Sequence, residues 1–370
     1  MFIDSYRYII STDVFFRLVY TSIVLFWVLS YLSPSLSLLT GVNYILSLAL
    51  MFCLIFTKKI NQSYIGMFVI IYSLLILLIF FISRIYYLTP SYSALTIILN
   101  LWIGLGLCVY GVYFRAIKAL HILFCLYVIF LILFLDVAPA KVMRNSYNHI
   151  SIVAIGLLVL SNLNYSYKNS KFILIQIYLT FAVCLISLGR SGILSSLFLL
   201  ISASLYFINI SNMSRFKKRV FRSIFYLGMA LGIVLFLNSD FALRFIASAI
   251  NLAGREEIFL NYFSTMGPKE LFIGHDVEFT RVFIDPKLSI HNSYLGMHQG
   301  AGIFGIGLLI LIMLTLPIML KQNFVHFSLY LTILLRGFTD NIIYTNSFLY
   351  GAIVTAYILY TFLKAKTDRI

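Results

Sequence analysis

The stretch YIGMFVIIYSLLILLIFFIS, residues 64–83, contains no charged side chain and no proline. An α-helix crosses the hydrocarbon core of a bilayer with about 20 mostly apolar residues, and it satisfies its backbone hydrogen bonds internally. This stretch therefore predicts a membrane-spanning helix. The whole chain has a similar character, because 62% of its 370 residues are hydrophobic and only 11% are charged. Soluble domains have about 45–50% apolar and about 25% charged residues, so this composition excludes an ordinary soluble protein.

The same criterion, applied outward from residues 64–83, predicts about twelve spans. They lie near residues 14–32, 35–57, 64–83, 93–113, 116–136, 149–163, 171–188, 191–210, 219–238, 299–320, 324–338 and 343–363. The expected fold is an all-α integral membrane protein with three parts. Residues 1–238 hold nine helices, residues 239–298 form a long loop, and residues 299–370 hold three more helices and a tail.

Positive charge is distributed unevenly between the two sides of this map. Sixteen lysines and arginines lie on the side of the termini, and five lie in the short loops on the other side. Cytoplasmic loops are enriched in lysine and arginine, so we expect both termini in the cytoplasm and the long loop on the outer side. The net charge of +15 then reflects topology, and the expected partner is membrane lipid, with no nucleic acid.

The four cysteines, Cys53, Cys108, Cys125 and Cys184, all lie inside apolar runs. Their spacing is not that of metal ligands, and small apolar packing residues often have this placement. We therefore expect no structural disulfide, no metal site and no cofactor.

The long loop at 239–298 has mixed charge and moderate polarity. Within it, Phe241–Leu252 and Glu256–Phe263 have the pattern of short helices, and Gly267-Pro268 indicates a turn.

Three ionisable residues on the outer side suggest chemistry. Arg190 lies in LGRSGILSSL between two apolar runs, Arg255 lies in AGREEIF, and His291 lies in SIHNSY just before the tenth span. Each has an ordinary alternative explanation: an interfacial arginine that reaches water, a solvated charge paired with a neighbouring glutamate, and a structural histidine.

Their common location on one membrane face favours a functional set. A guanidinium offers a fixed fork of donors that suits phosphate oxygens, and a histidine can accept a proton near neutral pH. The set suits a lipid-linked pyrophosphate leaving group and a hydroxyl nucleophile.

Other outer residues are weaker candidates for substrate binding. Asp276 and Arg281 follow the loop glycine, where solvation alone would explain them, and His275 has the same alternative. Arg336 and Asp340 are four residues apart, a spacing that allows an ion pair on a helix. Asn292 is expected to hold the His291 region by hydrogen bonds.

A family resemblance rests on three motifs within residues 185–310. His291-Asn292, nine further residues, and then Gly302 and Gly305 resemble the His-Asn…Gly-x-x-Gly signature of the O-antigen ligase and O-antigen polymerase superfamily. Gly254-Arg255 and the following Leu-Phe-Ile-Gly274 resemble its loop pattern. The run LGRSGIL around Arg190 resembles the arginine-containing turn that opens the next helix in these proteins.

The resemblance implies a metal-independent, membrane-embedded glycosyltransferase of the GT-C type in the bacterial inner membrane, with a periplasmic loop. Its donor and acceptor would be undecaprenyl-diphosphate-linked glycans. By position, Arg190 and Arg255 would bind the donor diphosphate, and His291 would activate or orient the acceptor hydroxyl. Attack from the opposite face would invert the anomeric centre. The family also implies a chain-length regulator protein as a partner.

Three functions are weighed. The favoured one is a polymerase that joins lipid-linked repeat units, because the modest length, the composition and the Gly-Arg-Ser-Gly turn resemble that branch. The first alternative is the ligase that transfers finished O-antigen to the lipid A core. The second is a flippase for lipid-linked sugars, which would need charges within its spans and two related halves. The spans contain few charges, mainly Arg17 near the start of the first, and no repeated halves are evident.

Overall fold

The computed structural model describes residues 2–32, 37–57, 60, 63–87, 93–143, 147–163, 170–210, 214–223, 226–227, 255–275, 292–340, 342–344 and 348–367. Within these residues the regular elements are helices and no strand occurs. The named helices are α1 (Phe2–Leu32), α2 (Ser37–Ile55), α4 (Tyr64–Tyr87), α5 (Ser93–Val109), α6 (Phe114–Leu133), α7 (Pro139–Val142), α8 (Tyr147–Ser161), α9 (Ser170–Ile186), α10 (Arg190–Ile210), α13 (Arg255–Ser264), α14 (Pro268–Ile273), α15 (Ser293–Gln322), α16 (Phe324–Thr339) and α17 (Phe348–Thr367). The prediction of an all-α fold is confirmed for this part of the chain.

Several of these helices suit a bilayer. Eleven of the twelve predicted spans overlap a helix named above. The remaining one, 219–238, is described only at residues 219–223 and 226–227, which are helical. Five described helices are long and apolar enough to cross a membrane: Thr12–Leu32, Tyr64–Tyr87, Phe114–Leu133, Arg190–Asn209 and Ser293–Gln322. Six shorter apolar helices accompany them: Gly41–Ile55, Ala94–Val109, Asn148–Ser161, Ile173–Ile186, Phe324–Phe338 and Leu349–Leu363. The protein is therefore membrane-embedded through apolar helices.

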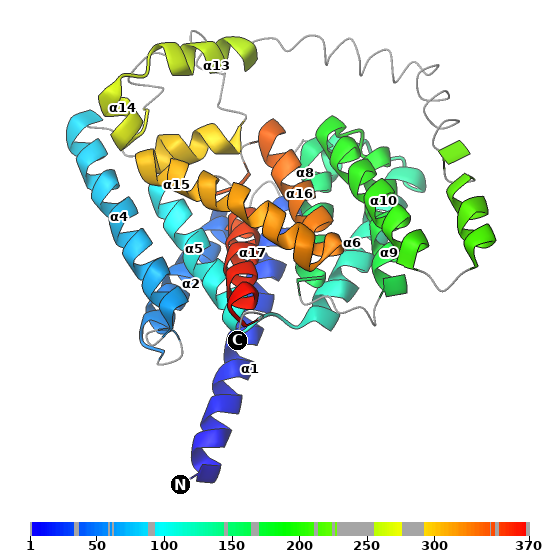
Figure 1. The fold of residues 1–370 in the computed structure, drawn as a ribbon, viewed down its shortest axis with the longest axis horizontal. Coiled ribbons are helices and arrows are strands. Elements are labelled where there is room, and N and C mark those ends of the chain that lie inside the picture. The colour runs from blue at the N-terminus through cyan, green and yellow to red at the C-terminus, as the bar shows by residue number, and fades with distance from the viewer. Residues whose placement is uncertain are drawn as a thin grey trace.

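Helix α17 is the core of the bundle. It packs against α5, α8, α15 and α16 (Figure 1). Its buried side chains, such as Tyr350, Ile353, Val354 and Tyr357, point in all directions around the helix, which is the pattern of a helix enclosed by others. Helix α4 differs, because one of its faces exposes large apolar side chains such as Leu74 and Phe81. That face requires lipid, or another apolar surface, as its solvent.

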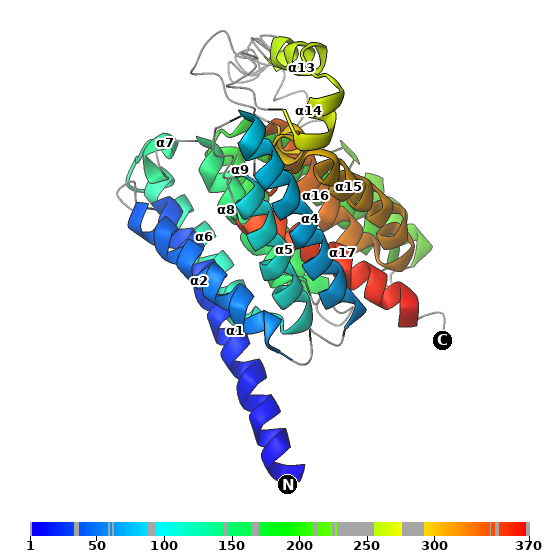
Figure 2. The same cartoon turned by 90° about the vertical axis from the view of Figure 1, so that its left-hand side faces the viewer.

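The loop helices α13 and α14 cap one end of the bundle. Both views place α13 beyond the end of α4 and α14 beside that end, whereas α1 begins and α17 ends toward the opposite end (Figures 1 and 2). Helix α13 matches the short helix predicted at Glu256–Phe263, and Gly267 forms the predicted turn before α14. The helix predicted at Phe241–Leu252 lies outside the described residues.

Helix α15 is bent at Gly302, where φ is 52° and ψ is −132°. A Cβ atom there would lie 2.1 Å from the carbonyl oxygen of Phe272 in α14. Beyond the bend, a Cβ on Gly305 would lie 2.2 Å from the carbonyl oxygen of Met297. Only glycine fits either contact. The Gly-x-x-Gly motif therefore permits close packing, as expected, and it also sets apart a short first segment of α15.

Replacing Gly302 with alanine is expected to lower the free energy of unfolding, because both the positive φ and the Phe272 carbonyl oppose a side chain. The backbone conformation alone should cost about 1–3 kcal/mol. The measurement is the thermal unfolding midpoint of the purified protein in detergent. Gly41→Ala in α2 is the matched control, since nothing lies within 4 Å of its Cβ position. Equal midpoints for the two variants would contradict this account of the bend.

Candidate functional site

A buried ion pair lies at the end of α16 that faces the loop helices. Arg336 and Asp340 form this pair, as their spacing predicted, with side chains 0% and 16% exposed. The Nη2 atom of Arg336 also donates to Asn148 O and Ser151 Oγ of α8, each at 3.3 Å. The guanidinium is thus held between α16 and α8.

Helix α10 joins the same cluster through the residue after Arg190. Ser191 Oγ donates to Asp340 Oδ2 at 3.3 Å. Gly192 lets α10 approach α8, because a Cβ there would lie 2.3 Å from Ser151 Cβ. Arg190 itself is the first residue of α10 and is exposed. The Gly-Arg-Ser-Gly turn therefore opens a helix, presents its arginine outward and fixes its serine inward.

The start of α15 is the third segment of the cluster. Asn292 caps the helix, with Oδ1 accepting from Tyr294 N at 2.9 Å and Leu295 N at 3.2 Å, while Nδ2 donates to Phe338 O at 3.3 Å. Ser293 Oγ donates to Asp340 O at 2.7 Å. The same Ser293 oxygen accepts from the backbone N–H groups of residues 342 and 343, at 2.8 and 2.9 Å.

These contacts define a cluster of five side chains, Ser151, Ser191, Ser293, Arg336 and Asp340. We call it the outer hub because it lies at the end of the bundle that the loop helices cover. It joins α8, α10, α15 and α16 and the turn before α17. Arg190 adjoins it through Ser191, and Asn292 adjoins it through Ser293. The structure thus brings together three sequence segments that are far apart in the chain, those around Arg190, around Asn292 and around Arg336.

Several of the predicted site residues lie outside the described part of the chain. His291, Asp276 and Arg281 lie outside the described residues. Arg255 begins α13, but its side chain also lies outside them. Asn292 holds backbone groups, as expected, and Arg336 is fully buried. Direct substrate contact by any of these residues stays a prediction.

A second polar cluster fixes the loop helices to α15, and one of its histidines, His298, was not predicted from the sequence. His298 Nε2 lies 3.1 Å from Leu271 O, and Nδ1 lies 2.7 Å from the hydroxyl of Tyr262. A carbonyl only accepts, so Nε2 carries the proton and Nδ1 accepts from the tyrosine. Burial raises the pKa of Tyr262 well above its ordinary value, which keeps this hydroxyl protonated as the donor.

His275 belongs to the same cluster, and the interpretation of it as a solvated loop residue is wrong. Its side chain is fully buried, its Nε2 lies 2.8 Å from Thr265 Oγ1, and its ring packs edge-on against Tyr262 with centroids 4.8 Å apart. Tyr87 of α4 donates to Gly274 O at 3.0 Å. These contacts require α13, α14 and α15 to meet, which no local pattern reveals.

An apolar groove of about 410 Å³ runs between α13, α15 and α16. Phe259 and Phe263 line it from α13, and Leu309 and Met313 line it from the second part of α15. Its polar members, Asn292, Tyr262 and His298, belong to or adjoin the two clusters described above. The groove therefore extends from the polar end of the bundle onto its apolar side.

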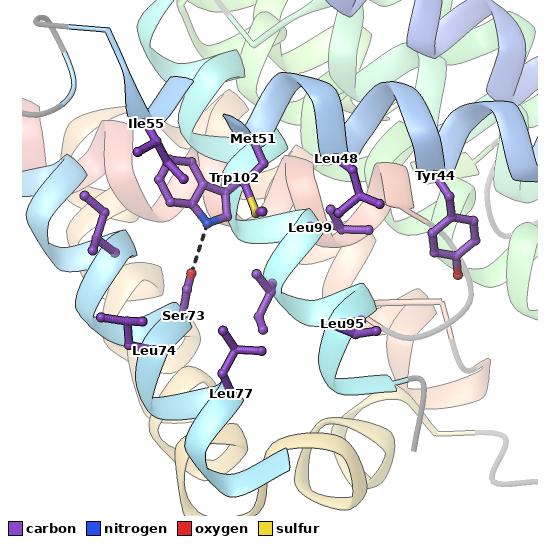
Figure 3. Close-up of a pocket in the computed structure, with 12 residues that line it drawn as sticks. Tyr44, Leu48, Met51, Ile55, Ser73, Leu74, Leu77, Leu95, Leu99 and Trp102 are labelled. Carbon is purple, nitrogen blue, oxygen red and sulfur yellow. Dashed lines mark hydrogen bonds between the residues drawn. The ribbon is translucent and has the colours of Figure 1, made fainter. Parts of the chain in front are cut away.

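A second cavity, of about 540 Å³, lies between α2, α4 and α5 (Figure 3). Its lining is almost wholly apolar, and Trp102 Nε1 donates to Ser73 Oγ at 3.1 Å across it. It contains none of the predicted site residues.

The outer hub and the groove together define the class of protein: an all-α membrane protein with a polar site at one end of its bundle and an apolar groove beside it. Such a site has the shape and polarity to accept an amphiphile, with a polar head beside Asn292 and an apolar chain in the groove. Among the described residues, no group of three or more histidine, cysteine or acidic side chains could hold a metal ion. Neither known protein-family models nor curated proteins match this chain.

Ser293→Ala is expected to destabilise the outer hub, because it leaves the N–H of Ile343 without its partner. The N–H of Ile342 still donates to the Asp340 carbonyl, at 3.0 Å. One unsatisfied buried N–H should cost about 1–3 kcal/mol, so the midpoint of thermal unfolding should fall. Ser264→Ala in α13 is the control, since that exposed serine bonds only within its own helix. An unchanged midpoint for Ser293→Ala would show that water or another group replaces the hydroxyl.

Proposed function

We propose that this protein is a polymerase of O-antigen or a related surface polysaccharide. It joins undecaprenyl-diphosphate-linked repeat units at the periplasmic face of the bacterial inner membrane. In this proposal the chain has about twelve spans, a GT-C-like arrangement and both termini in the cytoplasm. The long loop with α13 and α14 lies in the periplasm.

The outer hub is the observation that carries the proposal. The resemblance rests on separate motifs that a single reaction would have to bring together. Ser191, next to Arg190, and Ser293, two residues after His291, both bond to Asp340. Two of the three motifs therefore meet at one residue, as a shared site requires.

The proposed reaction is an inverting glycosyl transfer. The acceptor hydroxyl oxygen attacks the anomeric carbon of the donor, and its proton passes to His291. The bond from that carbon to the diphosphate breaks, and its electron pair leaves with the phosphate oxygen. Arg190 and Arg255 offset the charge that develops on this leaving group. Diphosphate departs without protonation, so the pair of carboxylic acids that glycosidases use is not needed.

The apolar groove supports a lipid-linked substrate. It begins beside Asn292 and continues along Leu309 and Met313, side chains that suit an isoprenoid chain. Nucleotide sugars are a cytoplasmic resource, so a site on the outer face calls for a carrier lipid.

Replacing Arg190, Arg255 or His291 with alanine is expected to abolish long glycan chains while the protein still reaches the membrane. The reason is the loss of leaving-group stabilisation or of the proton acceptor. The measurement is the ladder of lipopolysaccharide chains on a gel, with membrane protein quantified in parallel. Arg84→Ala is the matched control, because Arg84 is also an exposed arginine, in the last turn of α4. Normal ladders from all three variants would refute the site.

A deletion strain separates the polymerase from the alternatives. A lipid A core that carries single repeat units indicates a polymerase. A bare core with polymer retained on the carrier lipid indicates the ligase. A bare core with unpolymerised units held on the cytoplasmic face indicates a flippase.

Filling the groove is expected to weaken binding of the lipid-linked donor. Leu309→Trp should raise the KM for donor, because Leu309 lines the groove, and should leave the rate at saturation nearly unchanged. Ile310→Trp is the matched control on the adjacent residue, which is exposed and does not line the groove. The assay uses purified protein with carrier-lipid oligosaccharides extracted from the deletion strain. If both variants have the same KM for donor, the groove does not bind the donor.

A further inference from the structure

The Arg336–Asp340 pair has no part in the proposed reaction, and stability alone does not explain it. Arg336 is fully buried, and removing a guanidinium from water is costly. A buried ion pair can often be replaced by apolar side chains of similar volume at no loss of stability, whereas removing one partner leaves an uncompensated charge. We therefore look for the contribution of this pair in the relative positions of the helices that it connects.

The geometry enforced here involves four helices. Arg336 fixes α16 to α8 through Asn148 and Ser151. Asp340 binds α10 with its carboxylate, through Ser191, and α15 with its carbonyl, through Ser293. The carboxylate is held in place by the guanidinium, and the carbonyl belongs to the same residue, so α10 and α15 have a common anchor.

Burial argues against a direct role for either side chain in substrate binding. A guanidinium with no exposed surface whose Nη atoms already contact a carboxylate, a carbonyl and a hydroxyl is poorly placed to take up a phosphate. Arg190, in contrast, is exposed at the end of α10. Arg336 inside the outer hub and Arg190 beside it thus face different surroundings.

We propose that the Arg336–Asp340 pair is a positioning element of the transfer site. It sets the start of α10 against the start of α15, and in this way it aligns Arg190 with the segment that carries His291. This inference rests on the proposed function, because the aligned groups act on one substrate only if that function is right. Arg336 then acts through Ser191 and Ser293 and makes no substrate contact of its own.

The test is the double variant Arg336→Met/Asp340→Leu, assayed on carrier-lipid oligosaccharides extracted from the deletion strain. Apolar replacement of both partners should keep the thermal midpoint near that of the wild type. The anchor for Ser191 is lost, so kcat should fall about 100-fold, the size of effect expected from a displacement of about 1 Å. The KM for donor should change little, since neither residue binds it. A purely structural pair would leave kcat unchanged in this variant.

Ser191→Ala is the second variant, and it answers the question if the double variant does not fold. It removes only the bond between α10 and Asp340, and kcat should again fall with little change in KM. Ser202→Ala is its control in the same helix, because Ser202 bonds only to the preceding turn of α10. Wild-type kcat in Ser191→Ala would overturn the positioning role.

His291→Ala, measured beside these variants, separates the two hypotheses. Loss of turnover in His291→Ala with wild-type kcat in the double variant would refute only the positioning role. Wild-type turnover in His291→Ala would refute the proposed site itself.

Discussion

Inside an apolar bundle, every backbone N–H and C=O group that is not bonded within a helix must find a partner in the protein. The outer hub is the place where this constraint is most demanding, because α15 begins, α16 ends and the chain turns toward α17 at the same point. Ser293 meets it with one hydroxyl that donates to Asp340 O and accepts two N–H groups. Asn292 meets it by capping α15 and reaching α16. The residue that ends α16, Asp340, also accepts a hydrogen bond from Ser191, and this bond holds the neighbouring Arg190 at the same end of the molecule.

The class of fold followed from the sequence because the bilayer imposes a simple rule on length and polarity. Helices such as α4 and α6 contain long apolar runs, with their charged residues near one end, so their existence and approximate limits were predictable. The short helix α13 was also predictable. The bend in α15 was not, because it depends on the contact between Gly302 and the carbonyl of Phe272, which are thirty residues apart in the chain.

Individual residues of the site were predictable from the sequence, but the hydrogen bonds that join them across helices were not. The i, i+4 spacing of Arg336 and Asp340 indicated an ion pair, and the opening of α10 at Arg190 followed the motif. The role of Ser191 and Ser293 was not predictable, since serine is common and a bond to Asp340 depends on how α10, α15 and α16 pack. His298 was overlooked and His275 was interpreted as solvated for a similar reason: a histidine in a polar loop or a glycine-rich run gives no local sign that it will be buried beside Tyr262.

The enclosed position of α17 has a consequence for the order of assembly. This helix follows all the other described helices in the chain, so it is synthesised after them, yet it occupies the middle of the bundle against α5, α8, α15 and α16. Until it enters, those four helices lack the apolar surface that α17 buries between them. Their packing is therefore completed only after this helix has been synthesised and inserted.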